Sequence, residues 1–261
     1  MSADISRILG KLDGLFARKE YAEAERLLHY WEQEGERSGD TKVYYLAVNE
    51  QMGLYRKLGR KEDALLAVRK MLRHLDRTNR RMSVEGATAL LNAGTVYKAF
   101  NMSEEGLPLF EEACFVYEEL LKPDDKRLAG LYNNMSSTLS DVGRLDEALE
   151  LCEKALCILS KKSGNEAEEA ITYLNMTAMY ETRDGIEKAQ EDIERCLENA
   201  REKLAAAEAV TEEGYMAFVF EKCAPTFGYY GWFAVKNELL RRAEEIYERL
   251  GAVKEDVNEG T

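Results

Sequence analysis

One helix-pair pattern recurs six times along the 261 residues, and its spacing constrains the fold more than any other feature. The steps between successive anchor positions are 40, 42, 42, 41 and 47 residues. A fixed period in this range is typical of solenoids, in which each unit packs only on its neighbours. We therefore expect an all-α protein built from about six stacked helix pairs. The anchors are Ala24, Ala64, Gly106, Ala148, Ala189 and, more weakly, Lys236.

The third unit shows how the pattern predicts two helices. Gly94 and Tyr97 lie one turn apart on one helix face, and the apolar pattern then breaks. Ser103 is a suitable first residue for a second helix, in which Phe110 continues the apolar stripe. A small residue at Gly106 allows two helix backbones to approach closely. The other units place small and aromatic residues in the same order.

This order of small and aromatic residues resembles the tetratricopeptide repeat, a helix–turn–helix unit of about 34 residues. The longer period of this chain is similar to the repeats of kinesin light chain and related peptide-binding adaptors. The resemblance implies a right-handed α–α superhelical solenoid, a single domain over residues 1–251 with a concave groove. The expected units are residues 5–40, 45–80, 87–122, 129–163, 170–207 and 212–251, and residues 252–261 form a frayed tail.

Asparagine recurs at one position of the first helix, as Asn92, Asn134 and Asn175. Asparagine is a mediocre helix former, so helix propensity does not explain it. Its amide both donates and accepts, and can pair with the backbone of an extended peptide. The resemblance implies that these three residues face the groove and clasp peptide backbone. The alternative is that the amides tie adjacent repeats together or cap a loop.

The neighbours of these asparagines predict what the groove accepts. Thr88, Thr95, Ser137 and Asp141 are small or acidic, which leaves room for a peptide. Lys98 is the basic residue near them, so we expect neutral to mildly basic peptides rather than strongly acidic ones. The formal net charge of −13 favours the same partners.

A second surface is basic. Residues 53–82 contain ten Lys or Arg and three acidic residues, on a chain that is otherwise strongly acidic. This patch could bind an acidic partner or the acidic end of another copy, or it is a solvated helix face. The overall charge disfavours nucleic acid. The residues we assign to the patch are Arg69, Arg73, Arg77, Arg80 and Arg81.

The C-terminal region is aromatic between residues 218 and 233. It either seals the end of the solenoid or forms a contact surface for a partner or a second copy. Pro225 lies inside this segment, and we expect it to kink the helix or to break it near Ala224.

Catalytic and metal-binding patterns are not found. The two histidines, His29 and His74, stand in different repeats without a cysteine or serine motif, and no phosphate-binding loop is present. We expect no enzyme and no cofactor. Five cysteines without a Cys-x-x-Cys pair, and the lack of a secretory signal or a membrane-spanning run, indicate a cytoplasmic protein.

The predicted function is therefore an adaptor or scaffold that binds an extended peptide segment of a partner protein. Two alternatives stay open: a receptor for a signalling peptide whose output is a partner protein, and a structural protein that assembles with itself. The expected state is a monomer or a weak homodimer, with no nucleic acid and no membrane among its partners.

Overall fold

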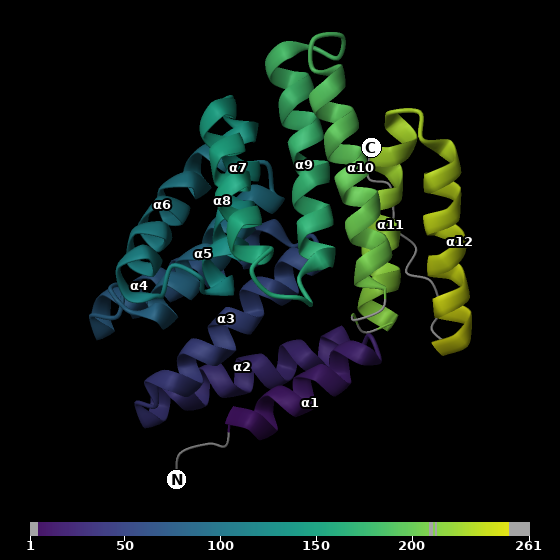
Figure 1. Ribbon diagram of the computed structural model, residues 1–261. Coiled ribbons are helices and arrows are strands. Elements are labelled where there is room, and N and C mark those ends of the chain that lie inside the picture. Colours follow the sequence, from purple (N-terminus) through teal and green to yellow (C-terminus); the bar gives the residue numbers. More distant parts are fainter. Residues whose placement is uncertain (1–4, 209–210, 212, 251–261) are drawn as a thin grey trace. The chain divides into compact units, whose positions relative to one another are not determined.

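The computed structural model describes residues 5–208, 211 and 213–250, and the secondary structure in these ranges is entirely α-helical (Figure 1). The predicted tail at 252–261 lies outside the described residues. Twelve helices follow one another in pairs: α1 (Ile5–Ala17), α2 (Tyr21–Ser38), α3 (Thr41–Lys57), α4 (Lys61–Thr78), α5 (Val84–Ala99), α6 (Ser103–Leu120), α7 (Lys126–Asp141), α8 (Leu145–Leu159), α9 (Glu166–Asp184), α10 (Gln190–Ala207), α11 (Glu213–Tyr229) and α12 (Phe233–Leu250). The predicted all-α repeat fold of six helix pairs is confirmed.

The pairs fall into two compact units. The first comprises Met1–Pro123 and contains α1–α6, and the second comprises Asp124–Thr261 and contains α7–α12. The single solenoid domain and its unit boundaries remain predictions, and each unit is described separately below.

The anchor positions fall at a constant place in the helix pairs. In α2, α4, α6, α8 and α12 the anchor is the fourth residue of the helix. Five of the six anchors are buried, including Gly106, and the exception is the half-buried Lys236. In the fifth unit α10 begins at Gln190, one residue after Ala189, so this helix starts later than the pattern predicted.

The first unit is held by packing between consecutive helices. Its N-terminal core contains Ile8, Leu12 and Leu15 of α1 against Leu28 of α2 and Leu54 of α3. In the third pair, Gly94 faces the fully buried ring of Phe110, where a methyl group on Gly94 would lie 2.8 Å from the ring. The predicted close approach of the two helices at small residues is thus observed.

The second unit has its own core. Cys152 of α8 is fully buried and lies 3.3 Å from Ser136 Oγ of α7 and 3.9 Å from Met179 Sδ of α9. Phe220 and Phe227 of α11 are also fully buried. This core joins successive pairs, as a repeat architecture requires.

Pro225 does not break the helix that contains it. Helix α11 runs from Glu213 to Tyr229, so of the two predicted outcomes the break near Ala224 is wrong, and the kink stays a prediction. Proline lacks the N–H that would bond to the carbonyl of Glu221, which normally weakens a helix interior. Here the proline ring lies on the exposed side, while the opposite side packs through Phe220, Ala224 and other buried residues. The burial of that face holds the helix together across the proline.

Within the described ranges, every helix falls short of the length or the apolar character that a membrane crossing requires.

Candidate functional site

The first helices of the three pairs in the second unit, α7, α9 and α11, border an open hollow of about 890 Å³. A hollow of this size is large enough for several side chains of a bound segment. Its lining residues are Ser137, Ser140, Asp141, Leu174, Asn175, Thr177, Ala178, Met179, Glu181, Thr182, Pro225, Thr226, Tyr229 and Tyr230.

Three of the residues predicted to contact a peptide line this hollow together: Ser137, Asp141 and Asn175. Asn175 stands at the middle of α9 and is partly exposed. Its side-chain amide hydrogen-bonds to none of the residues that the structure describes. The amide is therefore available to a ligand.

The other two asparagines use their amides within the protein. Asn92 Nδ2 donates to Asn49 Oδ1 at 2.8 Å and so links α5 to α3. Asn134 Nδ2 donates to the carbonyl of Gly130, one turn earlier in α7, at 2.8 Å. Asn92 thus ties adjacent repeats, which is the alternative considered from the sequence. A role of Asn92 or Asn134 toward a ligand stays a prediction.

The two threonines predicted near the groove belong to the first unit. Thr88 Oγ1 lies 2.7 Å from the hydroxyl of Tyr117 and donates to the carbonyl of Val84 at 2.9 Å. Thr95 Oγ1 donates to the carbonyl of Leu91 at 2.9 Å. Both hydroxyls are therefore engaged inside the unit, and neither residue lines the hollow of the second unit.

A carboxylate and two phenols form one end of the hollow. Glu181 accepts hydrogen bonds from the hydroxyls of Tyr229 (2.8 Å) and Tyr230 (2.7 Å). The two rings meet edge to face with centroids 4.9 Å apart. Burial and the bond to Glu181 raise the pKa of Tyr230 above its usual range, so both phenols remain neutral donors near neutral pH.

The repeat pattern does not place Glu181, Tyr229 or Tyr230 in the groove. The available signal is the aromatic density of residues 218–233, which predicts either a cap or a contact surface. Tyr229 is 69% exposed, so it does not act as a sealed cap residue. The pairing with Glu181 joins residues almost 50 positions apart and depends on the packing of α11 against α9.

The predicted basic patch is divided among several environments. Arg69, Arg73 and Arg77 are exposed at successive turns of α4. Arg81 instead pairs with Asp76 (2.5 Å) and with Glu112 of α6 (2.7 Å), and Arg80 is half-buried. The three exposed arginines form the part of the patch that remains open to solvent.

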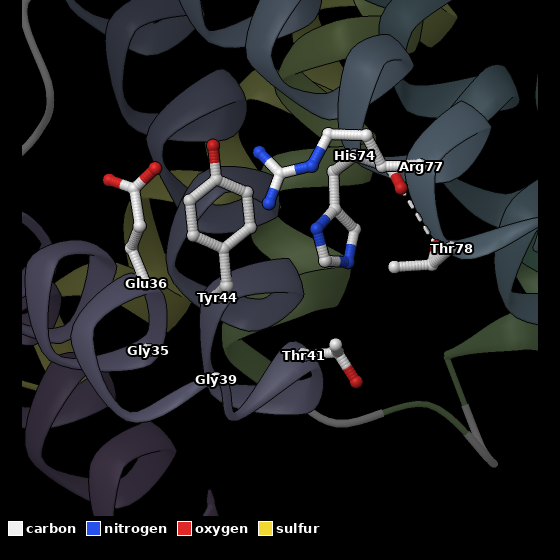
Figure 2. Close-up of a pocket in the computed structure, with 8 residues that line it drawn as sticks. All are labelled: Gly35, Glu36, Gly39, Thr41, Tyr44, His74, Arg77 and Thr78. Atoms are coloured by element: carbon white, nitrogen blue, oxygen red, sulfur yellow. Dashed lines mark hydrogen bonds between the residues drawn. The ribbon is translucent and has the colours of Figure 1, made fainter.

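Arg77 also lines a small hollow of about 60 Å³ in the first unit, which Figure 2 shows. There His74 stacks on Tyr44 with ring centroids 4.8 Å apart, and Glu36 lies on the other side of the tyrosine. Burial, together with the charges of Arg77 and the neighbouring Arg80, lowers the pKa of His74. The imidazole is therefore neutral near neutral pH and acts as a packed aromatic ring.

The next feature is the set of side chains that could bind a metal ion or act as nucleophiles. Among the described residues, no group of three His, Cys, Asp or Glu is placed to hold a metal ion. Burial raises the pKa of Cys152 and of Cys196 to about 11 and that of Cys223 to about 12, so these thiols are protonated and poorly nucleophilic.

Comparisons with known proteins find similarity to helical repeat proteins. Residues 127–202 match the tetratricopeptide repeat family. Protein KINESIN LIGHT CHAIN-RELATED 3 of Arabidopsis thaliana is 27% identical over 124 residues, which are 47% of this chain and 19% of that protein. The chain thus spans a small part of the length of the curated relative it matches.

Two solved structures resemble the chain over most of its length. The apo form of RapI has a TM-score of 0.67 at 14% identity, with 96% of this chain and 86% of that chain covered. BtubC (BKLC) of P. vanneervenii has a TM-score of 0.62 at 14% identity, with 94% and 96% covered. At such identities the likeness concerns the fold. The chain is thus an all-α helical repeat protein in which residues 127–202 match the tetratricopeptide repeat, and it is similar to proteins of the kinesin-light-chain type.

Proposed function

We propose that the chain is a protein-interaction adaptor that holds an extended segment of a partner protein in the hollow between α7, α9 and α11. A tetratricopeptide repeat fold supports a scaffold that contacts other proteins. The observation that carries the finer proposal is the amide of Asn175, which lies in an open hollow without a hydrogen-bond partner among the described residues.

An amide at this place suits an extended backbone. Its carbonyl accepts from a peptide N–H while its NH₂ group donates to a peptide C=O, so one side chain fixes both groups of a residue. Small lining residues such as Ser137 and Ala178 leave space beside it for the segment to lie along the helices. Main-chain pairing would then give affinity, and the surrounding side chains would give selectivity.

The proposal includes no catalytic step. The buried thiols are protonated, and His74 is packed and neutral. The proposed location is the cytoplasm, where the five free cysteines of the chain stay reduced. The monomer or weak homodimer expected from the sequence belongs to the same proposal.

The test is a comparison of partners captured from cell extract by the wild-type chain and by Asn175→Ala. Asn237→Ala is the matched control, because Asn237 is an exposed asparagine on α12 of the same unit and does not line the hollow. The proposal expects a partner that is retained by the control and lost with Asn175→Ala. Circular dichroism of each variant confirms that the helices are intact. Equal capture by all three chains would contradict the proposal.

A further inference from the structure

Helix α4 presents a basic row to solvent. Leu66, Arg69, Arg73 and Arg77 follow one another at intervals of three and four residues, and all four are exposed. Residues at these intervals form one line along a helix. Among the residues that the structure describes, no carboxylate pairs with the three guanidinium groups, and Arg73 Nε donates only to the carbonyl of Arg69. Glu62, one turn before Leu66, is the acidic residue at the start of this line, so the positive charge lies along the rest of it.

Helix α6 presents the opposite charge. It contains six glutamates and neither lysine nor arginine. Its acidic row consists of Glu105, Pro108, Glu112, Phe115 and Glu119, which are all exposed except the half-buried Glu112. Within the described part of the chain, Glu105 and Glu119 form no ion pair. Their carboxylates are therefore available to a cationic partner.

An ion pair brings the two rows together in the first unit. Arg81, which follows α4, donates to Glu112 of α6 at 2.7 Å. Because Glu112 stands in the middle of the acidic row, the end of α4 lies beside the middle of α6. Arg81 also pairs with Asp76 at 2.5 Å, so its own charge is used inside the chain. The rest of the two rows keeps its charge open to solvent.

We propose that this surface binds a second copy of the chain, with the basic row of α4 in each copy against the acidic row of α6 in the other. In a two-fold dimer the same patch faces itself, so a patch that carries both charges side by side is complementary to its own copy. The neighbouring positions of α4 and α6 allow both contacts in one interface. The inference does not depend on the proposed peptide site, since that hollow lies within the second unit.

Both rows also contain a large apolar side chain. Phe115 is 56% exposed and Leu66 is 41% exposed. Aromatic and aliphatic groups that leave water on association supply much of the affinity of protein interfaces. Exposed ion pairs contribute little by themselves, so they set the orientation of the two copies while the apolar groups add to the affinity.

Charge complementarity favours a second copy over an unrelated acidic partner. An acidic segment would match α4 but would leave the acidic row of α6 without a counter-charge, whereas a second copy matches both rows. The net charge of −13 makes two copies repel at long range. At physiological ionic strength the Debye length is about 8 Å, which screens this repulsion while groups in direct contact still attract.

Size exclusion with light scattering, from micromolar to near-millimolar full chain, tests the inference. Arg69→Glu/Arg73→Glu reverses the charge of the basic row, and Glu105→Lys/Glu119→Lys reverses that of the acidic row. We expect the wild type to dimerise as its concentration rises. Each double variant should weaken the dimer by about ten-fold or more, because the two-fold axis repeats every exchange.

Lys42→Glu/Arg56→Glu is the matched control for the basic row. Both residues are exposed on α3 of the same unit, and the variant changes the net charge by the same amount as the reversal on α4. It should dimerise as the wild type does. Phe115→Ser should weaken the dimer without a change of charge, and circular dichroism of each variant confirms that the helices are intact.

The decisive measurement mixes the two charge-reversed variants at a concentration at which neither dimerises alone. In the mixed dimer the acidic α4 row of one chain faces the basic α6 row of the other, and the second contact joins two unchanged rows. We therefore expect a mixed dimer, in which a histidine tag on one variant retains the other.

Three results would each overturn the inference: a wild type that stays monomeric at every concentration, a dimer that both charge reversals leave intact, and folded variants that fail to associate when mixed. None of them affects the comparison of Asn175→Ala with its control, so the proposed function is judged separately.

Discussion

At the scale of single residues, the repeat depends on which of two facing helices supplies the small side chain. In the third pair both Gly94 and Gly106 are glycine, and the ring of Phe110 fills the space. In the last pair the anchor is Lys236, yet Gly228 stands opposite, where a methyl group would lie 2.6 Å from Lys236 Cδ. In this pair the small residue at the contact is therefore Gly228 on the first helix, one turn after Ala224. This explains how a lysine occupies an anchor position that is otherwise alanine or glycine.

The contact at Gly94 gives a first prediction. Gly94→Ala should lower the free energy of unfolding by about 1–3 kcal/mol, because Phe110 is fully buried and cannot move aside. Gly53→Ala is the control: Gly53 is an exposed glycine inside α3, and no described residue lies within 4 Å of an added methyl group. It should stabilise by about 0.5–1 kcal/mol, because alanine is the better helix former. Urea unfolding followed by circular dichroism measures both, and equal effects would refute the close contact.

A second prediction concerns pH. The ordinary pKa of histidine is 6.5, and in the folded protein burial, Arg77 and Arg80 lower the pKa of His74. Glu36, the acidic residue of the same hollow, does not reverse this shift. Below pH 6.5 the unfolded chain therefore takes up a proton that the folded chain refuses. Stability should be full above pH 6.5 and should fall as the pH decreases from there toward the folded pKa.

The variant His74→Phe isolates this contribution, because it keeps an aromatic ring against Tyr44 and removes the titrating group. Urea midpoints at pH 7.5 and pH 5.5 should differ less for the variant than for the wild type. The slope assigned to His74 cannot exceed about 1.4 kcal/mol per pH unit. An unchanged slope would show that other groups cause the pH dependence.

At the scale of helices, three of the first helices begin with a side-chain cap, whereas five of the second helices do not. Asp40, Ser83 and Asp125 cap α3, α5 and α7 by accepting hydrogen bonds from backbone N–H groups of the first turn. The second helices α2, α4, α6, α8 and α10 lack such a side-chain bond. In five of the six pairs, the second helix begins two positions after a residue of positive φ. These residues are Lys19 before α2, Gly59 before α4, Asn101 before α6, Gly143 before α8 and Gly231 before α12.

This turn gives a third prediction. Gly143 has φ +79°, and no described residue lies within 4 Å of an added methyl group, so Gly143→Ala tests the backbone alone. It should destabilise the chain by about 1–2 kcal/mol, the cost of a left-handed conformation for a residue with a Cβ. Lys19 already bears that cost at φ 56°. Lys19→Gly should therefore stabilise the fold, but by only about 0.5 kcal/mol, because the greater entropy of glycine in the unfolded chain offsets part of the relief.

Thermal and urea unfolding of the two variants measures the difference. If the changes in the free energy of unfolding have opposite signs for Gly143→Ala and Lys19→Gly, this supports a common turn that sets the start of the second helix. The fifth pair departs from this rule, because Gly185 has a positive φ but α10 begins five residues later. The sequence could not reveal that difference, since Ala189 keeps the anchor residue type and is buried in the same way.

At the scale of the whole molecule, the hollow lies entirely within the second unit. All of its lining residues fall between Ser137 and Tyr230, and the unit has its own buried core. A fragment of residues 124–261 should therefore keep its helical circular dichroism and should capture the same partner from cell extract as the full chain. Trp232 borders the tyrosine pair and provides a fluorescence signal for binding. A folded fragment that no longer binds would show that residues of the first unit are needed.

The sequence by itself determined the repeat. The period, the small anchors and the breaks between helices predict six helix pairs, because small residues at a fixed interval are what close helix packing requires. It also placed Ser137, Asp141 and Asn175 near a common surface, since equivalent positions of successive repeats lie side by side.

Only the tertiary structure decided which of the repeated asparagines have a side-chain amide available to a ligand. Asn92 and Asn175 occupy the same place in their repeats, yet Asn92 bonds to Asn49 whereas Asn175 finds no such neighbour among the described residues. The position in the repeat specifies where a side chain points, but its hydrogen-bond partner can belong to a neighbouring helix pair, and that partner varies from one repeat to another. For the same reason the meeting of Glu181 with Tyr229 and Tyr230 could not be predicted from a repeating pattern.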